Sequence, residues 1–268
     1  DTEGRLLEEA LFGPRAPDPE KERDASNDRD AQAHEHAGAL AVTDARLLLM
    51  PIRSAHGGWA WITSPLILQR LARDLGHSDG TNERPKWAQL TTDSTKALVS
   101  AKGIGIAPNG KLVVEDAVYD ITENDDVGGL AKVLAEMAFP SSEVYEPLRA
   151  RLSQQLAVVS DEEMSYWARH GTEVVTRVRI DDDTGTVEDG ALWTEEALPS
   201  ESVLWSLVMI SGSRQRSDRR TKDASAGGLD ERFGTKLDGH PRIFLGGDRT
   251  VGRGLVALRR KEGNNGKA

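Results

Sequence analysis

The stretch that most constrains the fold lies near the C-terminus, at residues 243–258. Two short apolar runs there flank a glycine-rich loop, and this pattern predicts a strand, a loop and a second strand. The loop residues of interest are Gly246, Gly247, Arg249, Thr250, Gly252, Arg253 and Gly254. Glycines let the backbone approach a partner closely and expose its N–H groups as donors, while the arginines add positive charge. The loop therefore predicts contact with an anionic, repeating ligand such as a nucleic-acid backbone.

The charge distribution supports this prediction, although the net charge of −10 at first argues against a nucleic-acid binder. Residues 209–268 contain 14 Lys and Arg against 7 Asp and Glu, a local net charge of +7. Residues 1–208 therefore carry −17. A polarised molecule of this kind can bind an anion on one face and stay soluble through the other.

Composition narrows the class of protein further. The 268 residues include no cysteine, which excludes disulfides and thiolate metal sites and fits a reducing cytoplasm. No apolar run approaches the roughly 20 residues that a membrane span needs, and no charged-then-apolar leader opens the sequence. We expect a cytoplasmic protein with no membrane partner.

Along the chain, apolar periodicity and turn residues predict alternating helices and strands. A helix at 3–11 is followed by a mobile loop at 15–37, strands at 38–50 and 59–63, and a helix from Ser64 and Pro65 to Gly76. We interpret 77–155 as an insertion with helices at 127–139 and 142–155 and a strand at 111–121. The remaining predictions are a strand at 156–159, a helix from the capping box at Ser160 to Gly171, a hairpin at 172–199, a strand at 202–210, a flexible basic segment at 211–221 and a short helix at 227–233.

Two other patterns carry less weight. Residues 252–257 match a dinucleotide fingerprint when alanine replaces the last glycine, but only 11 residues remain for the helix, strand and acidic residue that such a site needs. His34 and His36, with Asp44 nearby, could be drawn as a metal site. The segment is loop-like and offers no third ligand at a diagnostic spacing, so we prefer an exposed loop and assign no metal ligand.

The hairpin at 172–199 holds further candidates. Arg177 and Arg179 lie two residues apart and hence on one face of a strand, where they could contact phosphates or simply form a solvated surface. Glu195 and Glu196 form an adjacent carboxylate pair, for which a solvated strand edge is a better interpretation than catalysis.

Several stretches, taken together and in order, resemble one family over nearly the whole chain. They are LFG at 11–13, AG at 37–38, TDARLLLMPIRS at 43–54, WAWITSP at 59–65, VVSDE at 158–162, DGALWTEEALP at 189–199 and LGGDRTVGRGL at 245–255. The set resembles the backbone subunit of type III-B CRISPR (Cmr) effector complexes, within the RAMP superfamily.

The resemblance implies an α+β fold: a single RAMP domain with a modified ferredoxin-like (RRM-like) palm, insertions and a projecting β-hairpin thumb at 172–199. Copies of such a subunit stack along crRNA beside other Cmr subunits, and each thumb displaces a nucleotide in the duplex of guide and target RNA. Leu192 and Trp193 would supply apolar or stacking contacts, and the glycine-rich loop would hold the guide backbone as the second half of the grip.

The resemblance also implies cleavage of target RNA by a metal-dependent endoribonuclease, with Mg as the expected divalent cation. The family's catalytic aspartate lies in a loop before the first helix, and the first palm strand is expected there too, so both are expected outside this sequence. We therefore assign no catalytic residue, interpret Asp44 as structural, and keep a purely structural RNA scaffold without nuclease activity as the alternative function.

Overall fold

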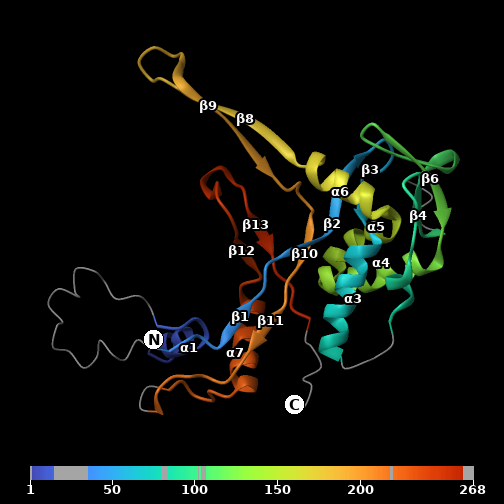
Figure 1. Ribbon diagram of the computed structural model, residues 1–268. Helices are drawn as coiled ribbons and strands as arrows, with labels where there is room; N and C mark the ends of the chain where they lie inside the picture. Colours follow the sequence, from blue (N-terminus) through green and yellow to red (C-terminus); the bar gives the residue numbers. More distant parts are fainter. Residues whose placement is uncertain are drawn as a thin grey trace. The chain divides into compact units, whose positions relative to one another are not determined.

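The chain divides into two compact units. The computed structural model describes residues 2–14, 36–79, 84–101, 103, 107–217 and 220–261. The larger unit comprises Arg46–Trp205 and Lys261–Ala268, and the smaller unit comprises Asp1–Ala45 and Ser206–Arg260 (Figure 1). Each unit has hydrophobic clusters of its own, which is why the two separate. The predicted loop at 15–37 lies almost wholly outside the described residues.

A seven-stranded mixed sheet forms the centre of the larger unit, in the order β10-β2-β3-β7-β4-β6-β5. Its strands are β2 (Arg46–Ser54), β3 (Gly58–Thr63), β4 (Lys96–Val99), β5 (Lys111–Val114), β6 (Ala117–Glu123), β7 (Leu156–Val158) and β10 (Val203–Trp205). The pairs β3–β7 and β4–β6 are parallel, whereas β2–β3, β4–β7, β5–β6 and β10–β2 are antiparallel. Ser54 of β2 also pairs with Val114 of β5, so the sheet curls back on itself.

Both faces of this sheet are buried, as the continuous apolar run in β2 predicts. Leu49 and Trp61 lie in one cluster, and their neighbours Met50 and Ile62 lie in the other. The alternation follows from the two-residue repeat of a strand. The helices of the unit are α3 (Pro65–Asp79), α4 (Asp125–Ala138), α5 (Glu146–Gln155) and α6 (Asp161–His170). The predicted cap of α6 is confirmed, because Ser160 Oγ accepts from Glu163 N at 3.2 Å.

The segment 77–155, interpreted as an insertion, is part of the central sheet and core of the larger unit. This segment supplies β4, β5, β6 and α4, whose residues lie in the central clusters. The single strand predicted at 111–121 is a hairpin, because Glu115 adopts a left-handed φ of 48° between β5 and β6. A turn at Glu115 and Asp116 has no glycine or proline to mark it in the sequence, which explains the error.

Two further segments that the sequence predicts as single strands each form two strands. Each is interrupted where the chain passes from one unit to the other. The strand at 38–50 is β1 (Leu40–Val42) followed by β2, and the strand at 202–210 is β10 followed by β11 (Val208–Ile210). Thr43 N donates to Leu207 O at 3.0 Å and Leu207 N donates to Thr43 Oγ1 at 2.9 Å, so the interruptions lie beside each other. Helix α3 runs past Gly76, because one glycine costs a helix only about 1 kcal/mol.

The smaller unit contains α1 (Thr2–Phe12), the β1–β11 pair, α7 (Ala226–Gly239), and the hairpin of β12 (Arg242–Phe244) and β13 (Leu255–Ala257). Its core includes Leu7, Leu11 and Leu229. Helix α7 is twice as long as the predicted segment at 227–233. None of the helices in the described part of the chain is long and apolar enough to cross a membrane.

A buried carboxylate joins three elements of the larger unit. Asp74 of α3 accepts hydrogen bonds from Arg46 Nη1 of β2 at 2.9 Å, from Arg73 Nε at 3.0 Å, and from Trp205 Nε1 of β10 at 3.0 Å. Burial alone would raise the pKa of Asp74. The hydrogen bonds from Trp205 and Arg73 and the charges of Arg73 and Arg46 outweigh it, and the pKa is lowered from its ordinary 3.8.

We expect Asp74→Asn to lower the free energy of unfolding by about 1 to 3 kcal/mol, because the amide removes the charge and presents a donor where an acceptor is needed. Urea unfolding at neutral pH measures the change. The control is Asp116→Asn on an exposed turn, which should leave stability nearly unchanged. Equal effects of the two substitutions would contradict the role given to Asp74.

The same pair of proteins gives a pH prediction. Because the folded-state pKa of Asp74 is lowered, its contribution is complete above the unfolded value near 3.8 and is lost as pH falls through the folded-state pKa. The stability gap between the wild-type chain and Asp74→Asn should therefore shrink below pH 3.8. A gap that widens under acid would show that the sign is wrong.

Candidate nucleic-acid interface

The glycine-rich loop connects two short antiparallel strands, as the sequence predicts. Residues Arg242, Ile243 and Phe244 of β12 pair with Ala257, Val256 and Leu255 of β13. The connection includes a short 3₁₀ turn, Arg249–Val251, that begins after Asp248 in the left-handed region with φ of 59°. Asp248 O accepts from Val251 N and from Arg253 N, each at 3.1 Å. These bonds give the loop a defined shape on the smaller unit.

The glycines of this loop fall into two groups. At Gly254 an added Cβ would lie 2.1 Å from Leu245 O, and φ is 75°, so only glycine fits where the two ends of the loop meet. At Gly246, Gly247 and Gly252 an added Cβ would meet no atom within 4 Å. Gly254 thus shapes the loop, whereas the other three leave backbone open to a ligand.

Cationic and apolar side chains surround this open backbone. The Arg249 guanidinium lies over the Phe244 ring, with Cζ 4.6 Å from the ring centroid. Thr250 and Arg249 are exposed, and Arg253 is half-buried. The apolar side chains of Phe244, Leu245, Val251 and Leu255 are exposed as well. Backbone amides, a cation and flat apolar surface are the contacts that a sugar-phosphate chain with unstacked bases requires.

The second predicted element is a long hairpin of the larger unit, β8 (Glu173–Ile180) and β9 (Val187–Ala197), which extends away from the sheet and helices of that unit (Figure 1). Its turn is held by Asp181, whose carboxylate accepts from Thr184 N at 2.7 Å and Asp183 N at 3.0 Å. The hydrogen bonds from Thr184 lower the pKa of Asp181. The hairpin is therefore an ordered arm at neutral pH.

The two faces of the hairpin differ. On one face, Val174, Val178 and Leu192 are exposed, and Ile180 and Val187 are exposed beyond a bulge. On the other face, Arg177 lies opposite Trp193 and pairs with Glu195, while Trp193 Nε1 donates to Glu195 Oε1 at 2.9 Å. Leu192 and Trp193, predicted together as RNA contacts, therefore point to opposite sides.

The arginines predicted on this hairpin already have carboxylate partners. Arg177 pairs with Glu195, and Arg179 Nη1 lies 3.4 Å from Glu188 Oε2. A phosphate would have to compete with these glutamates for either guanidinium. Sequence reasoning identified the arginines but missed both pairings and the exposed apolar face. The period-two spacing of Val174 and Val178 was the available signal for that face.

The other residues that the sequence analysis considered give no support for a metal site. His34 lies outside the described residues, and Asp44 is exposed in the link between β1 and β2, not within a strand. Across the part of the chain that the structure describes, no three His, Asp or Glu side chains group so that they could hold a metal ion.

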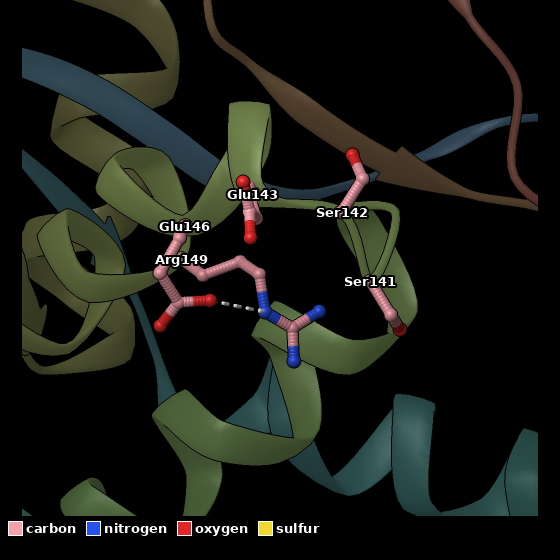
Figure 2. A pocket seen from close by; sticks show the side chains of 5 residues that line it. All are labelled: Ser141, Ser142, Glu143, Glu146 and Arg149. Atoms are coloured by element: carbon pink, nitrogen blue, oxygen red, sulfur yellow. Dashed lines mark ion pairs between the residues drawn. The ribbon is translucent and has the colours of Figure 1, made fainter.

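A pocket of about 400 Å³ lies where α4 is followed by α5, lined by Ser141, Ser142, Glu143, Glu146 and Arg149 (Figure 2). Arg149 Nη1 donates to Phe139 O at 3.1 Å and to Ala135 O at 3.3 Å, and its Nε lies 3.8 Å from Glu146 Oε2. The guanidinium thus caps the C-terminal end of α4. With two glutamates beside it, this pocket is a poor place for a phosphate.

The family model of the RAMP superfamily matches residues 1–257. The CRISPR system Cmr endoribonuclease Cmr4 of Pyrococcus furiosus is 34% identical over 236 residues, which cover 87% of this chain and 73% of that protein.

Solved structures show the same fold. The crystal structure of oligomeric Cmr4 from Pyrococcus furiosus matches with a TM-score of 0.61 and 21% identity, over 95% of this chain and 82% of that one. A chain in the cryo-EM structure of the type III-B Cmr-beta complex bound to cognate target RNA matches with a TM-score of 0.59 and 17% identity, over 96% and 81% of the two chains.

We expect Gly254→Ala to open the glycine-rich loop, because its Cβ would collide with Leu245 O and alanine disfavours the φ of 75°. Leu245 N, which donates to Gly254 O at 2.9 Å, should lose its protection from hydrogen exchange. The matched control is Gly247→Ala, where space is open and φ is ordinary, so protection should remain. Unchanged protection in Gly254→Ala would contradict this account of the loop.

Proposed function

The chain belongs to the RAMP superfamily and, within it, to the Cmr4 family of CRISPR Cmr subunits, and from this premise we propose that it is an RNA-binding backbone subunit of a type III-B CRISPR effector complex. Its ligands are crRNA and target RNA, and its protein partners are further copies of itself and other Cmr subunits. The related proteins support this assembly, since the matched structures include an oligomeric Cmr4 and a Cmr-beta complex with cognate target RNA.

The observation that carries the proposal is the glycine-rich loop of the smaller unit. Three glycines leave its backbone open, and Arg249 and Thr250 are exposed beside it. This combination suits a sugar-phosphate backbone better than a compact free nucleotide, because the loop leads into β13 and not into an α-helix whose N-terminus could receive a pyrophosphate.

We further assign parts of the larger unit to the architecture that the family resemblance implies. In this assignment β2, β3, α3 and β7 belong to a modified ferredoxin-like palm, and β8 with β9 is the thumb. The exposed apolar face around Val178 and Leu192 meets unstacked bases or a neighbouring subunit, and the opposite face presents Trp193. The support for these roles is the projection of the hairpin and its exposed side chains.

RNA cleavage is not assigned to any residue of this chain. The described residues gather no set of carboxylates or imidazoles for a divalent cation, and no step is derived through one. The second candidate is a structural scaffold that orders RNA and cuts nothing. Both candidates require RNA binding, which is therefore the property to test first.

We expect the pair Arg249→Ala and Arg253→Ala to weaken binding of single-stranded RNA and to lower the slope of log affinity against log salt by about 1 to 1.5, since each lost phosphate contact removes about 0.7. Fluorescence anisotropy over a salt series measures both. The control removes the same charge elsewhere, with Arg70→Ala and Lys132→Ala on exposed positions of α3 and α4. Equal slopes in both pairs, or tight binding of a free dinucleotide in place of RNA, would contradict the proposal.

A further inference from the structure

A second cationic segment lies in the smaller unit between β11 and α7. We call residues 213–217 and 220–222 the arginine loop. Its outward side chains are cationic at Arg214, Arg216, Arg220 and Lys222, all exposed. Ser213, Gln215 and Thr221 are buried between them, with 6%, 5% and 3% of their surface accessible. A segment expected to be flexible thus has an inner side and an outer side.

The buried amide of Gln215 holds the two arms of the arginine loop together. Its Nε2 donates to Leu6 O of α1 at 2.8 Å. Its Oε1 accepts from Thr221 N and from Ser213 Oγ, each at 3.1 Å. Because burying an unsatisfied amide is costly, these partners favour one conformation of the loop.

Glu3 of α1 holds the far arm. Its carboxylate accepts from Thr221 Oγ1 at 2.7 Å and Lys222 N at 3.1 Å, and it pairs with Arg232 of α7 at 2.9 Å. The Thr221 hydroxyl is the main cause of a lowered pKa for Glu3, with burial acting in the opposite direction. The arginine loop is therefore fastened to α1 and α7 at neutral pH.

The arginines of this loop differ from those of the β8–β9 hairpin in their partners. Arg220 Nη2 donates to Ser213 O at 3.0 Å, and Arg214 Nη1 lies 3.5 Å from Gly38 O. Main-chain carbonyls orient a guanidinium without neutralising its charge, and a guanidinium has five N–H donors. On the hairpin, by contrast, Arg177 and Arg179 face glutamates. The guanidinium groups of Arg214 and Arg220 thus keep their positive charge for an outside anion.

We propose that the arginine loop is a second RNA-contact element, in which Arg214 and Arg220 bind phosphates and Gln215 is a positioning residue. The inference rests on the proposed function, and it adds an element that the sequence motifs did not include. The arginine loop precedes α7, and β12, which leads into the glycine-rich loop, follows it, so both loops belong to the smaller unit on either side of this helix in the chain (Figure 1).

A loop fastened before binding needs little further ordering, which favours affinity. We therefore expect Arg214→Ala with Arg220→Ala to lower the salt slope of single-stranded RNA binding by about 1 to 1.5. The control is again Arg70→Ala with Lys132→Ala, which should keep the wild-type slope. Combining the arginine-loop pair with Arg249→Ala and Arg253→Ala should lower the slope by the sum of the two separate decreases.

The outcomes separate this inference from the function on which it rests. If the arginine-loop pair keeps the wild-type slope while the Arg249 and Arg253 pair lowers it, the inference is overturned and the proposed function stands. If the wild-type chain binds no RNA, both are overturned.

Gln215→Met tests the positioning role, because methionine is close in size but cannot make the three side-chain bonds. We expect it to lower the salt slope as the arginine pair does, although it removes no charge, while the thermal unfolding transition stays cooperative. A folded Gln215→Met variant with the wild-type slope would overturn the role of Gln215. Arg214 and Arg220 lie at the surface, so the variant Arg214→Ala with Arg220→Ala tests the RNA contact even if Gln215→Met does not fold.

Discussion

The larger unit depends on the carboxylate of Asp74, which accepts hydrogen bonds from β2, from β10 and from its own helix. Strand β10 is the edge strand by which the chain returns to the sheet after the β8–β9 hairpin. The Trp61 indole donates to Glu201 O at 2.9 Å just before β10 and holds the same return. Without these bonds, strand β10 would be held less firmly at the edge of the sheet. The β8–β9 hairpin, which ends at this strand, would then have no fixed direction for its exposed apolar face.

Charge is distributed differently in the two units, and this distribution explains why only some arginines suit RNA. In the larger unit, Arg177 and Arg179 lie opposite glutamates on the same hairpin. In the smaller unit, Arg214 and Arg220 face main-chain carbonyls, and Arg249 lies over an aromatic ring. Part of the sequence excess of Lys and Arg after residue 209 is thus placed on guanidinium groups that face carbonyls or a ring, which net charge alone does not reveal.

Sequence predicted the elements that local rules determine. The apolar run of β2, the cap of α6 at Ser160, the long hairpin and the strands around the glycine-rich loop are each confirmed at nearly the expected residues. The sequence did not predict the elements whose position tertiary packing determines. The short strand β4 is held by β6 and β7 on either side, and the Glu115 turn is held by main-chain bonds to β2. Neither leaves a local pattern.

The candidate site shows the same division. The glycine-rich loop was identified from composition and spacing, because glycines between two apolar runs mark a loop in the sequence itself. The partners of Arg177 and the network around Gln215 were not, since Leu6 and Gln215 are joined across more than 200 positions of sequence. Contacts of that range become visible only in the fold.

The most direct test of RNA binding at these elements is photocrosslinking of the full chain to single-stranded RNA carrying 4-thiouridine, with crosslinked peptides located by mass spectrometry. The account predicts crosslinks within residues 242–257 and on the β8–β9 hairpin. Crosslinks confined to α4 and α5, with none at the glycine-rich loop, would contradict it.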